Sequence, residues 1–183
     1  MFFKFLAIFF FIFFSPLFLA LALLIIIEDG FPVFFKQKRV GINYTFFDIY
    51  KFRSMKKNTP NVATHLLTNP DQYLLTIGKF IRKTSLDELP NLINIIKGEM
   101  VFVGPRPALY NQDDLMTLRI ATGVDKLKPG ITGWAQINGR DDISINKKVE
   151  LEQEYLSKKT FLFDLKILIK TFTNVLISKG VSH

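Results

Sequence analysis

The N-terminal segment from Phe5 to Ile27 contains 23 consecutive uncharged residues, and no second apolar run of this length follows in the 183-residue chain. A straight helix of that length would extend roughly 35 Å, at about 1.5 Å per residue, enough to cross a hydrocarbon core of about 30 Å. The run is longer than the apolar core of a typical signal peptide, and five apolar residues follow the cleavage-like sequence Ala20-Leu21-Ala22. The segment therefore predicts a membrane helix that is retained in the protein.

Ser15 and Pro16 lie near the middle of this run. A proline inside a helix removes a backbone hydrogen bond and bends the helix, which leaves two halves of about 11 residues, each too short to cross a bilayer. Positive charge lies on both sides, with Lys4 before the run and Lys36 and Lys38 after it. This arrangement suits a helix that enters the bilayer, bends and leaves by the same face, and it also suits a tilted, proline-kinked span.

After Ile27 the chain has charged residues every few positions, as a soluble domain does. The 24 Lys and Arg exceed the 16 Asp and Glu, giving a net charge of +8, which favours anionic partners such as nucleic acid, phosphorylated metabolites or acidic lipid headgroups. The chain has no cysteine and only two scattered histidines, His65 and His183. This excludes thiolate catalysis and Cys-ligated zinc and gives no basis for a Ser-His triad. Any chemistry must use carboxylates, Lys, Arg, Ser, Thr or Tyr.

Apolar periodicity predicts the remaining elements. Strands are expected at residues 32–35, 46–55, 100–103 and 131–137, and helices at 73–84, from residue 87 onward, at 146–160 and at 161–177. On the second strand Lys51 and Arg53 share a face, where two cations would either hold a phosphate or protect a solvated sheet edge. The last helix has an apolar stripe that includes Phe161 and Leu165, and it would either lie on a membrane interface or pack against the domain.

Asp87 and Glu88 are adjacent carboxylates in the stretch "RKTSLDELPNL". Ser85 and Glu88 have the spacing of a capping box, and Pro90 is tolerated best in the first turn of a helix. Both carboxylates would then lie at the positive end of the helix dipole. On these residues alone, helix capping and catalysis are both open interpretations.

Two further motifs follow. In "GPRP" two prolines fix the backbone on either side of Arg106, a stiff support that suits either bidentate phosphate binding or a rigid exposed turn. In "KPGITGWAQINGRDD" a strand is expected before a tight turn at Asn138-Gly139. Gln136 and Arg140 in this motif would contact a ligand or face water.

The ordered segments "KFRSM", "SLDELPNLINIIKGEM", "GPRP" and "KPGITGWAQINGRD" together resemble the bacterial sugar transferase family, the monotopic phosphoglycosyl transferases, in its short single-domain form. The resemblance extends from about Val33 to the C-terminal helix. It implies transfer of a sugar phosphate from a nucleotide diphosphate sugar, usually a UDP-sugar, to polyprenyl (undecaprenyl) phosphate at the cytoplasmic face of the bacterial inner membrane, with release of UMP, as the first membrane step of glycoconjugate assembly.

The resemblance also implies roles for residues of this chain. Asp87 matches the family's nucleophile, Glu88 its Mg²⁺-binding carboxylate, and Lys51, Arg82 and Arg106 its phosphate-binding cations. Gln136 and Arg140 are further candidates for substrate contact. Ser15 and Pro16 match the break of a re-entrant membrane helix. The expected partners are the UDP-sugar, polyprenyl phosphate and the lipid bilayer, without nucleic acid, and the oligomeric state is not indicated.

We therefore expect an α+β protein with a re-entrant membrane helix over residues 1–30 and a mainly helical catalytic domain with a small sheet over residues 31–183. Only Met1 to Lys4 precede the apolar run, whereas the family often has a basic, Asp-containing stretch there. Two competing hypotheses remain. One is a membrane-anchored basic protein that binds nucleic acid or acidic lipid, and the other is a glycosyltransferase that moves the sugar alone and releases UDP.

Overall fold

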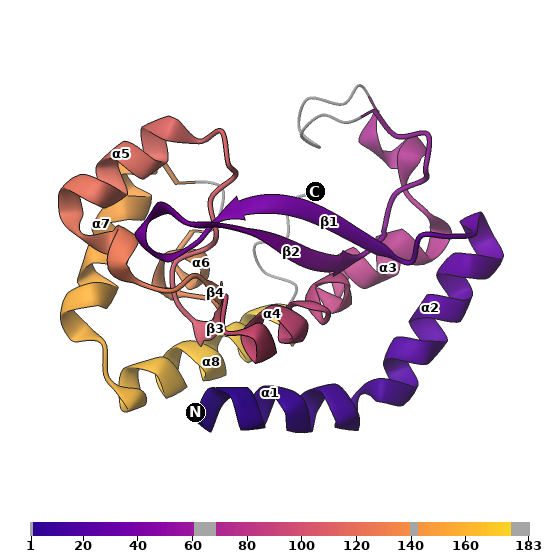
Figure 1. Cartoon of the computed structure of the whole chain (residues 1–183), viewed down its shortest axis with the longest axis horizontal. Helices are drawn as coiled ribbons and strands as arrows, with labels where there is room; N and C mark the ends of the chain where they lie inside the picture. Colours follow the sequence, from indigo (N-terminus) through magenta and orange to yellow (C-terminus); the bar gives the residue numbers. More distant parts are fainter. Residues whose placement is uncertain (1, 61–68, 140–142, 177–183) are drawn as a thin grey trace.

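The computed structural model describes residues 2–60, 69–139 and 143–176 (Figure 1). The described chain is mostly helical with two small sheets, which confirms the expected α+β class. The helices are α1 (Phe2–Phe13), α2 (Ser15–Asp29), α3 (Thr76–Lys83), α4 (Asn91–Lys97), α5 (Asp113–Thr122), α6 (Trp134–Ile137), α7 (Ile145–Lys158) and α8 (Phe161–Leu176). The strands are β1 (Phe34–Val40), β2 (Phe46–Phe52), β3 (Val101–Val103) and β4 (Gly130–Thr132), and 3₁₀ turns occur at Ile42–Tyr44, Pro70–Tyr73, Leu86–Glu88 and Val124–Lys126.

The apolar N-terminal run forms two helices, α1 and α2, which meet at an angle of 58°. Helix α2 begins at Ser15, with Pro16 in its first turn, because a proline there lacks only an N–H that has no intrahelical partner. The predicted break at Ser15-Pro16 is therefore confirmed. In the described part of the chain no single helix has the length and apolar character needed to span a membrane, whereas the bent pair meets both criteria when taken together.

The bent pair is attached to the rest of the chain at both ends. Helix α1 runs beneath α4 (Figure 1), where Ala7 is fully buried in a cluster with Leu92, Ile95 and Met100. At the end of α2, the Glu28 carboxylate accepts hydrogen bonds from the first N–H groups of α3, at Thr76 (2.5 Å) and Ile77 (3.2 Å). A carboxylate from a distant segment thus occupies the positive end of α3.

Arg53 also holds the end of α2, and this corrects one expectation. The guanidinium of Arg53 is bonded to the Asp29 carboxylate and donates to the carbonyl of Pro32 at 2.6 Å. Strand β2 ends at Phe52, so the alternation expected to place Arg53 beside Lys51 stops before Arg53. Of these two cations, only Lys51 faces the carboxylates described below.

The four described strands form two small, separate sheets. Strands β1 and β2 form an antiparallel hairpin in which Phe34 pairs with Phe52 and Val40 with Phe46. Strands β3 and β4 are parallel. The expected strand at 131–137 is wrong beyond Thr132, because the chain turns at Gly133 into the short helix α6. A Cβ at Gly133 would lie 2.1 Å from the carbonyl oxygen of Gly104, so the close approach of the two backbones requires glycine.

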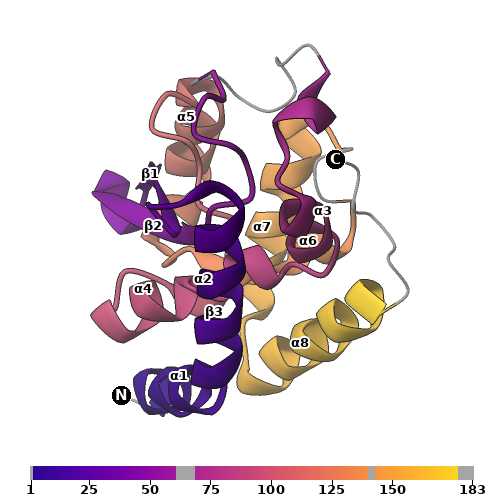
Figure 2. The ribbon, with the colours of Figure 1, turned by 90° about the vertical axis from the view of Figure 1, so that its right-hand side faces the viewer.

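Helix α8 packs against the domain, as one of the two expectations for it proposed, and also leaves an apolar surface exposed. Ile167 is fully buried with Tyr155 and Val103 in one core cluster, so one face of α8 packs against the domain. Another part of its surface is exposed and apolar, formed by Phe161, Leu162, Leu165, Ile169 and Phe172. Figures 1 and 2 place α8 and α1 along the same edge of the molecule.

Candidate active site

Asp87 and Glu88 lie in a 3₁₀ turn, Leu86–Glu88, between α3 and α4. The expected capping box is wrong: Ser85 adopts a left-handed conformation (φ 57°, ψ 18°), and its side chain makes no capping hydrogen bond. Helix α4 instead begins at Asn91, after Pro90. The Glu88 side chain is therefore not used as a cap and is directed to other partners.

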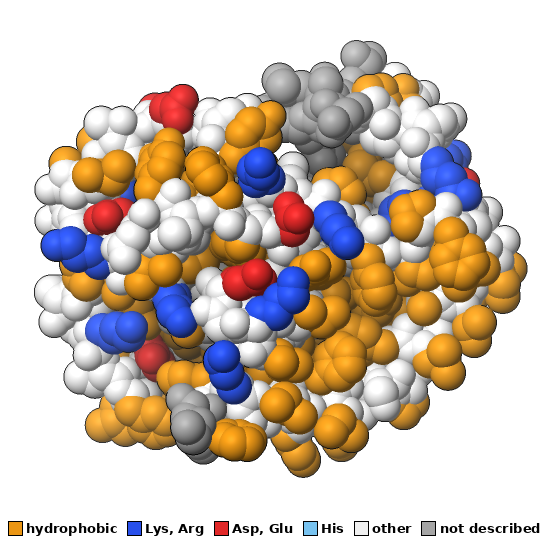
Figure 3. Space-filling view, in the orientation of Figure 1, with side chains coloured by type: hydrophobic (Ala, Val, Ile, Leu, Met, Phe, Trp, Pro, Cys, Tyr) orange, Lys and Arg blue, Asp and Glu red, His pale blue; other side chains and the backbone are white. Residues whose placement is uncertain are grey.

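Those partners are two cations from distant parts of the chain. Lys51 Nζ, from β2, lies 2.7 Å from Glu88 Oε1, and an Arg106 Nη atom, from the loop after β3, lies 3.3 Å from the same oxygen. Figure 3 shows charged side chains gathered across the middle of this face, beside the apolar surface formed by α1 and α2. The tertiary structure thus brings together three of the site residues expected from the sequence.

Asp87 is half-buried, and its burial raises the pKa of the carboxyl group from 3.8 to about 6. Lys51, Arg82 and Arg106 oppose this increase in pKa, whereas the neighbouring Glu88 charge adds to it. A carboxyl group with a pKa near neutrality at the centre of a cationic cluster is typical of a functional site.

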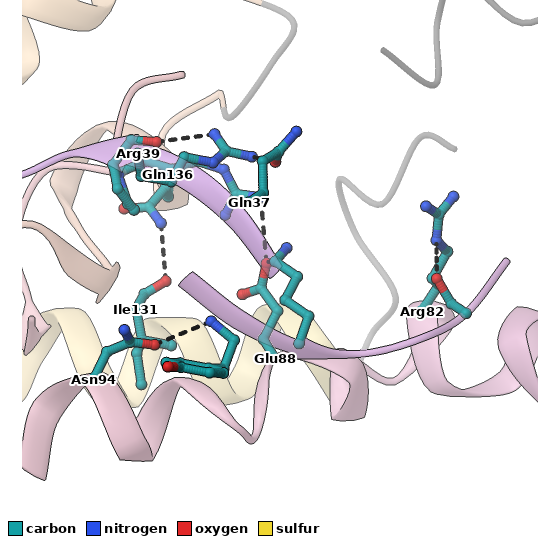
Figure 4. Close-up of polar contacts among 12 residues, drawn as sticks. Gln37, Arg39, Arg82, Glu88, Asn94, Ile131 and Gln136 are labelled. Carbon is teal, nitrogen blue, oxygen red and sulfur yellow. Dashed lines mark hydrogen bonds and ion pairs between the residues drawn. The ribbon is translucent and has the colours of Figure 1, made fainter. Parts of the chain in front are cut away.

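Arg82 lies on α3, to the side of the Glu88 cluster (Figure 4), and its Nε donates to Ser54 Oγ at 2.9 Å. Burial lowers the pKa of the Arg82 guanidinium, and the charge of Asp87 opposes that effect. Arg82 is thus electrostatically coupled to Asp87, whereas Lys51 and Arg106 contact Glu88.

The loop that carries Arg106 is held by three hydrogen bonds to successive carbonyl groups. Gly130 N–H donates to the carbonyl of Pro105 (2.9 Å), Arg119 to that of Arg106 (2.9 Å) and Arg39 to that of Pro107 (3.0 Å). Both prolines are buried, whereas the Arg106 side chain is partly exposed. The stiff support expected from "GPRP" is therefore present.

Arg119 and Glu152 form a buried ion pair that the sequence did not indicate. Arg119 Nε lies 2.8 Å from Glu152 Oε2 and an Arg119 Nη atom lies 2.5 Å from Oε1, with exposed side-chain fractions of only 6% and 2%. Nothing local distinguishes these residues from charged residues on a solvated helix face. Their pairing depends on the packing of α5 against α7.

A recess adjoins the Glu88 cluster. Its lining combines charged, amide and apolar side chains with backbone, from Arg39, Ile49, Lys51, Glu88, Asn91, Met100, Arg106, Pro107, Gly130 and Ile131. Asn91 was not identified from the sequence, although it lies within "DELPN". Gln136 donates from Nε2 to the carbonyl of Ile131 at 3.0 Å and so supports this wall from outside the lining. Arg140 lies outside the described residues.

The described residues contain no cluster of three or more His, Cys, Asp or Glu side chains that could bind a metal ion by themselves. Mg²⁺ is commonly bound in proteins by one or two carboxylates together with substrate phosphates and water. The oxygen donors of Glu88, with Asp87 adjacent in the same turn, fit that mode of binding.

Comparisons with known proteins identify the family of this chain. The family model described as "Bacterial sugar transferase" matches residues 1–178. The chain is similar to the uncharacterized sugar transferase EpsL of Bacillus subtilis, with 46% identity over 158 residues covering 86% of this chain and 76% of the relative.

Two longer relatives have more specific names. The UDP-glucose:undecaprenyl-phosphate glucose-1-phosphate transferase of Escherichia coli is 36% identical over 173 residues, covering 91% of this chain and 37% of the relative. The undecaprenyl-phosphate galactose phosphotransferase of Salmonella typhimurium is 38% identical over 171 residues, covering 84% of this chain and 35% of the relative.

Proposed function

Because the chain belongs to the bacterial sugar transferase family, we propose that it is a phosphoglycosyl transferase that moves a sugar 1-phosphate from a UDP-sugar to polyprenyl phosphate and releases UMP. The names of the two longer relatives, which act on undecaprenyl phosphate, support this reaction class. The observation that carries the proposal is the convergence of Lys51 and Arg106 on Glu88, next to the half-buried Asp87. Such a carboxylate pair next to several cations is suited to binding and transferring a phosphate group.

Asp87 is the proposed nucleophile. Its carboxylate oxygen attacks the phosphorus that bears the sugar, and the bond from that phosphorus to the bridging oxygen breaks, so that UMP leaves. The phosphate oxygen of the polyprenyl phosphate then attacks the same phosphorus and displaces Asp87, which restores the free carboxylate and yields polyprenyl diphosphate sugar. The covalent step divides one difficult displacement into two.

The cations position and neutralise the diphosphate. Lys51 and Arg106 share one oxygen of Glu88, so phosphate oxygens would compete with that carboxylate for them. Arg82 is coupled to Asp87 and would keep it ionised beside the phosphorus. Phosphoryl transfer depends mainly on such positioning and charge stabilisation, with each cation acting where negative charge accumulates.

Glu88 is the proposed ligand of Mg²⁺, which when bound would neutralise charge on the diphosphate and the departing nucleotide. Because a Glu88 oxygen is already the acceptor for Lys51 and Arg106, metal binding would free those cations for phosphate oxygens. Glu88 would thus hold Lys51 and Arg106 in place before substrate binds. When substrate and metal bind, Glu88 would contact the metal and the two cations would contact the phosphates.

The bent helix pair α1–α2 is the proposed membrane anchor. It would enter and leave the bilayer by the cytoplasmic face, with residues 31–183 as the catalytic domain and the exposed apolar residues of α8 at the interface. Because the chain lacks cysteine, Phe2→Cys and Asp71→Cys variants can be labelled separately in intact cells. Labelling of both from the cytoplasmic side is expected, and periplasmic labelling of residue 2 would mean a span.

The reaction is tested with the purified full chain in nanodiscs, incubated with Mg²⁺, undecaprenyl phosphate and a panel of UDP-sugars. Release of UMP with at least one donor is expected. Release of UDP would show that the sugar moves without its phosphate. The absence of either nucleotide across the panel would favour a membrane-anchored binding protein.

A further inference from the structure

Asn91 is a buried amide residue in the wall of the recess next to Glu88. It is the first residue of α4, and its exposed fraction is 1%. Among the described residues, no hydrogen-bond donor is paired with its buried oxygen, Oδ1. Buried polar atoms in folded proteins are nearly always paired, because leaving a buried acceptor without a donor costs free energy. The donor for Asn91 is therefore expected from outside the fold.

Asn94, one turn further along the same helix, provides a matched contrast. It is also completely buried, but its Oδ1 accepts from the N–H of Tyr50 at 3.1 Å. Its Nδ2 donates to the carbonyl of Asp48 at 2.7 Å and to Glu99 Oε2 at 2.8 Å. Asn94 is fully used in holding β2 against α4. The same residue type in the same helix is thus satisfied by the fold at position 94 but not at position 91.

The chemistry around Asn91 selects the kind of group that would satisfy it. A carbonyl oxygen cannot accept from a phosphate, whose oxygens are acceptors, and it requires an O–H or N–H donor. The phosphates of the donor already have Lys51 and Arg106 as partners in the proposed function, and both side chains border the same recess. Because the sugar is bonded to the phosphorus that Asp87 would attack, its hydroxyl groups are the donors nearest to this wall.

We propose that the Asn91 carbonyl oxygen accepts a hydrogen bond from a hydroxyl group of the transferred sugar and so contributes to the choice of sugar. This inference rests on the proposed function, since it requires a UDP-sugar in the recess. The oxygen is shielded from water, and hydrogen bonds in such surroundings are stronger than exposed ones. Movement of Lys51 and Arg106 from Glu88 onto donor phosphates would widen the approach to Asn91.

The test compares Asn91→Leu with wild type in nanodiscs, using the preferred UDP-sugar and analogues that each lack one sugar hydroxyl. For wild type, loss of the contacted hydroxyl is expected to reduce kcat/KM about tenfold to a hundredfold. For Asn91→Leu with the intact sugar a loss of the same size is expected, and removal of that hydroxyl should then cause no further loss. Non-additivity at a single hydroxyl position identifies the contact.

A structural role is separated from this one by stability. Asn91→Leu removes an unpaired acceptor and should leave the melting temperature unchanged or higher, whereas Asn94→Leu breaks three hydrogen bonds and should lower it. A melting temperature of Asn91→Leu as low as that of Asn94→Leu would overturn the inference.

Two kinetic results would also overturn it. In the first, the variant loses activity while every deoxy-sugar analogue keeps its wild-type ratio of kcat/KM to the intact sugar. In the second, non-additivity appears only with 2′-deoxyuridine or N3-methyluridine donors, which would place the nucleoside at Asn91. If wild type releases no UMP with any donor, the proposed function itself fails, an outcome distinct from unchanged sugar selectivity.

Discussion

The two ionic clusters of this protein differ in exposure and in how their partners are shared. Glu88 offers one oxygen to both Lys51 and Arg106, and the exposed side-chain fractions are 15%, 17% and 34%. Arg119 and Glu152 form a two-point contact at 6% and 2% exposure. The first cluster has competing cations at the edge of a recess, and the second has a single fixed geometry in the interior.

In the proposed function Lys51 and Arg106 leave Glu88 for phosphate oxygens, so we call these three residues the exchangeable cluster and the buried Arg119–Glu152 pair the fixed pair. Removing two charges from water carries a large desolvation cost, so a buried ion pair contributes little net free energy of folding. Its main contribution is to hold the segments that carry the two residues in one geometry. Here the Arg119 guanidinium also donates to the carbonyl of Arg106. The fixed pair therefore positions the loop that carries Arg106, a member of the exchangeable cluster.

The largest expected effect is on activity. Asp87→Asn removes the proposed nucleophile and should reduce UMP release by about 10⁴-fold or more, because the asparagine amide is a far weaker nucleophile than the carboxylate. The measurement is UMP release together with covalent labelling by a radiolabelled UDP-sugar. The control is Asp71→Asn, whose side chain is 77% exposed and which should behave as wild type. Near-normal turnover of Asp87→Asn would contradict the covalent mechanism.

Breaking the fixed pair should mainly reduce stability. Arg119→Met leaves Glu152 buried without its cation, and the free energy of unfolding should fall by about 3–5 kcal/mol, with partial recovery in the double variant carrying Glu152→Met. Chemical denaturation of each variant in detergent measures this.

The control for that comparison is Lys147→Met. Its partner Glu150 is 66% exposed and lies 2.8 Å away, and loss of such a surface pair should change the free energy of unfolding by less than about 1 kcal/mol. If Arg119→Met and Lys147→Met changed the free energy of unfolding equally, burial of the ion pair would not determine the loss of stability.

Changing the exchangeable cluster should alter its response to metal. Glu88→Gln keeps the shape of the side chain but removes the charge proposed to bind Mg²⁺. The Mg²⁺ concentration for half-maximal UMP release should therefore rise by about tenfold. Titration of Mg²⁺ at saturating donor checks this, with Glu150→Gln as the matched surface control. An unchanged Mg²⁺ requirement would remove Glu88 from the metal site.

Titration of Asp87 should make activity depend on pH. Because the pKa of Asp87 in the fold is raised to about 6, the fraction in the ionised, nucleophilic form falls as pH decreases through 6. The rate should therefore fall about tenfold per pH unit below 6 and be constant above it. Single-turnover UMP release between pH 5 and 8 measures this, and a rate independent of pH across that range would contradict the assignment.

The same pKa increase predicts the pH dependence of stability. A carboxyl whose pKa rises on folding prefers the neutral form, so ionised Asp87 destabilises the fold as pH rises from about 4 to about 6. The difference in unfolding free energy between Asp87→Asn and wild type should grow over that interval to on the order of 2–3 kcal/mol and then level off. A constant difference would mean that burial does not perturb Asp87.

Sequence patterns predicted the elements whose causes are local. Helical spacing indicated α3, α7 and α8, alternation indicated β2, and Pro16 indicated the break between α1 and α2. Two of the failed expectations concern Ser85 and Gly133, and a contact between distant segments explains the second of them. Ser85 was expected to cap a helix but adopts a left-handed turn, and the strand expected through Ile137 ends where Gly133 lies against Gly104.

The sequence by itself determined that the apolar N-terminus is broken at Ser15-Pro16 and that thiolate chemistry is excluded, which left carboxylates, Lys, Arg, Ser, Thr and Tyr as candidate groups. These properties follow from composition and from steric rules that act within a few residues. Only the tertiary structure decided the partners: Lys51 reaches Glu88 across 37 positions, and Arg119 reaches Glu152 across 33. It also decided that Asn94 is satisfied while the Asn91 oxygen is not. Pairing of this kind brings together segments that are far apart in the sequence, and these segments come close only when the core has packed.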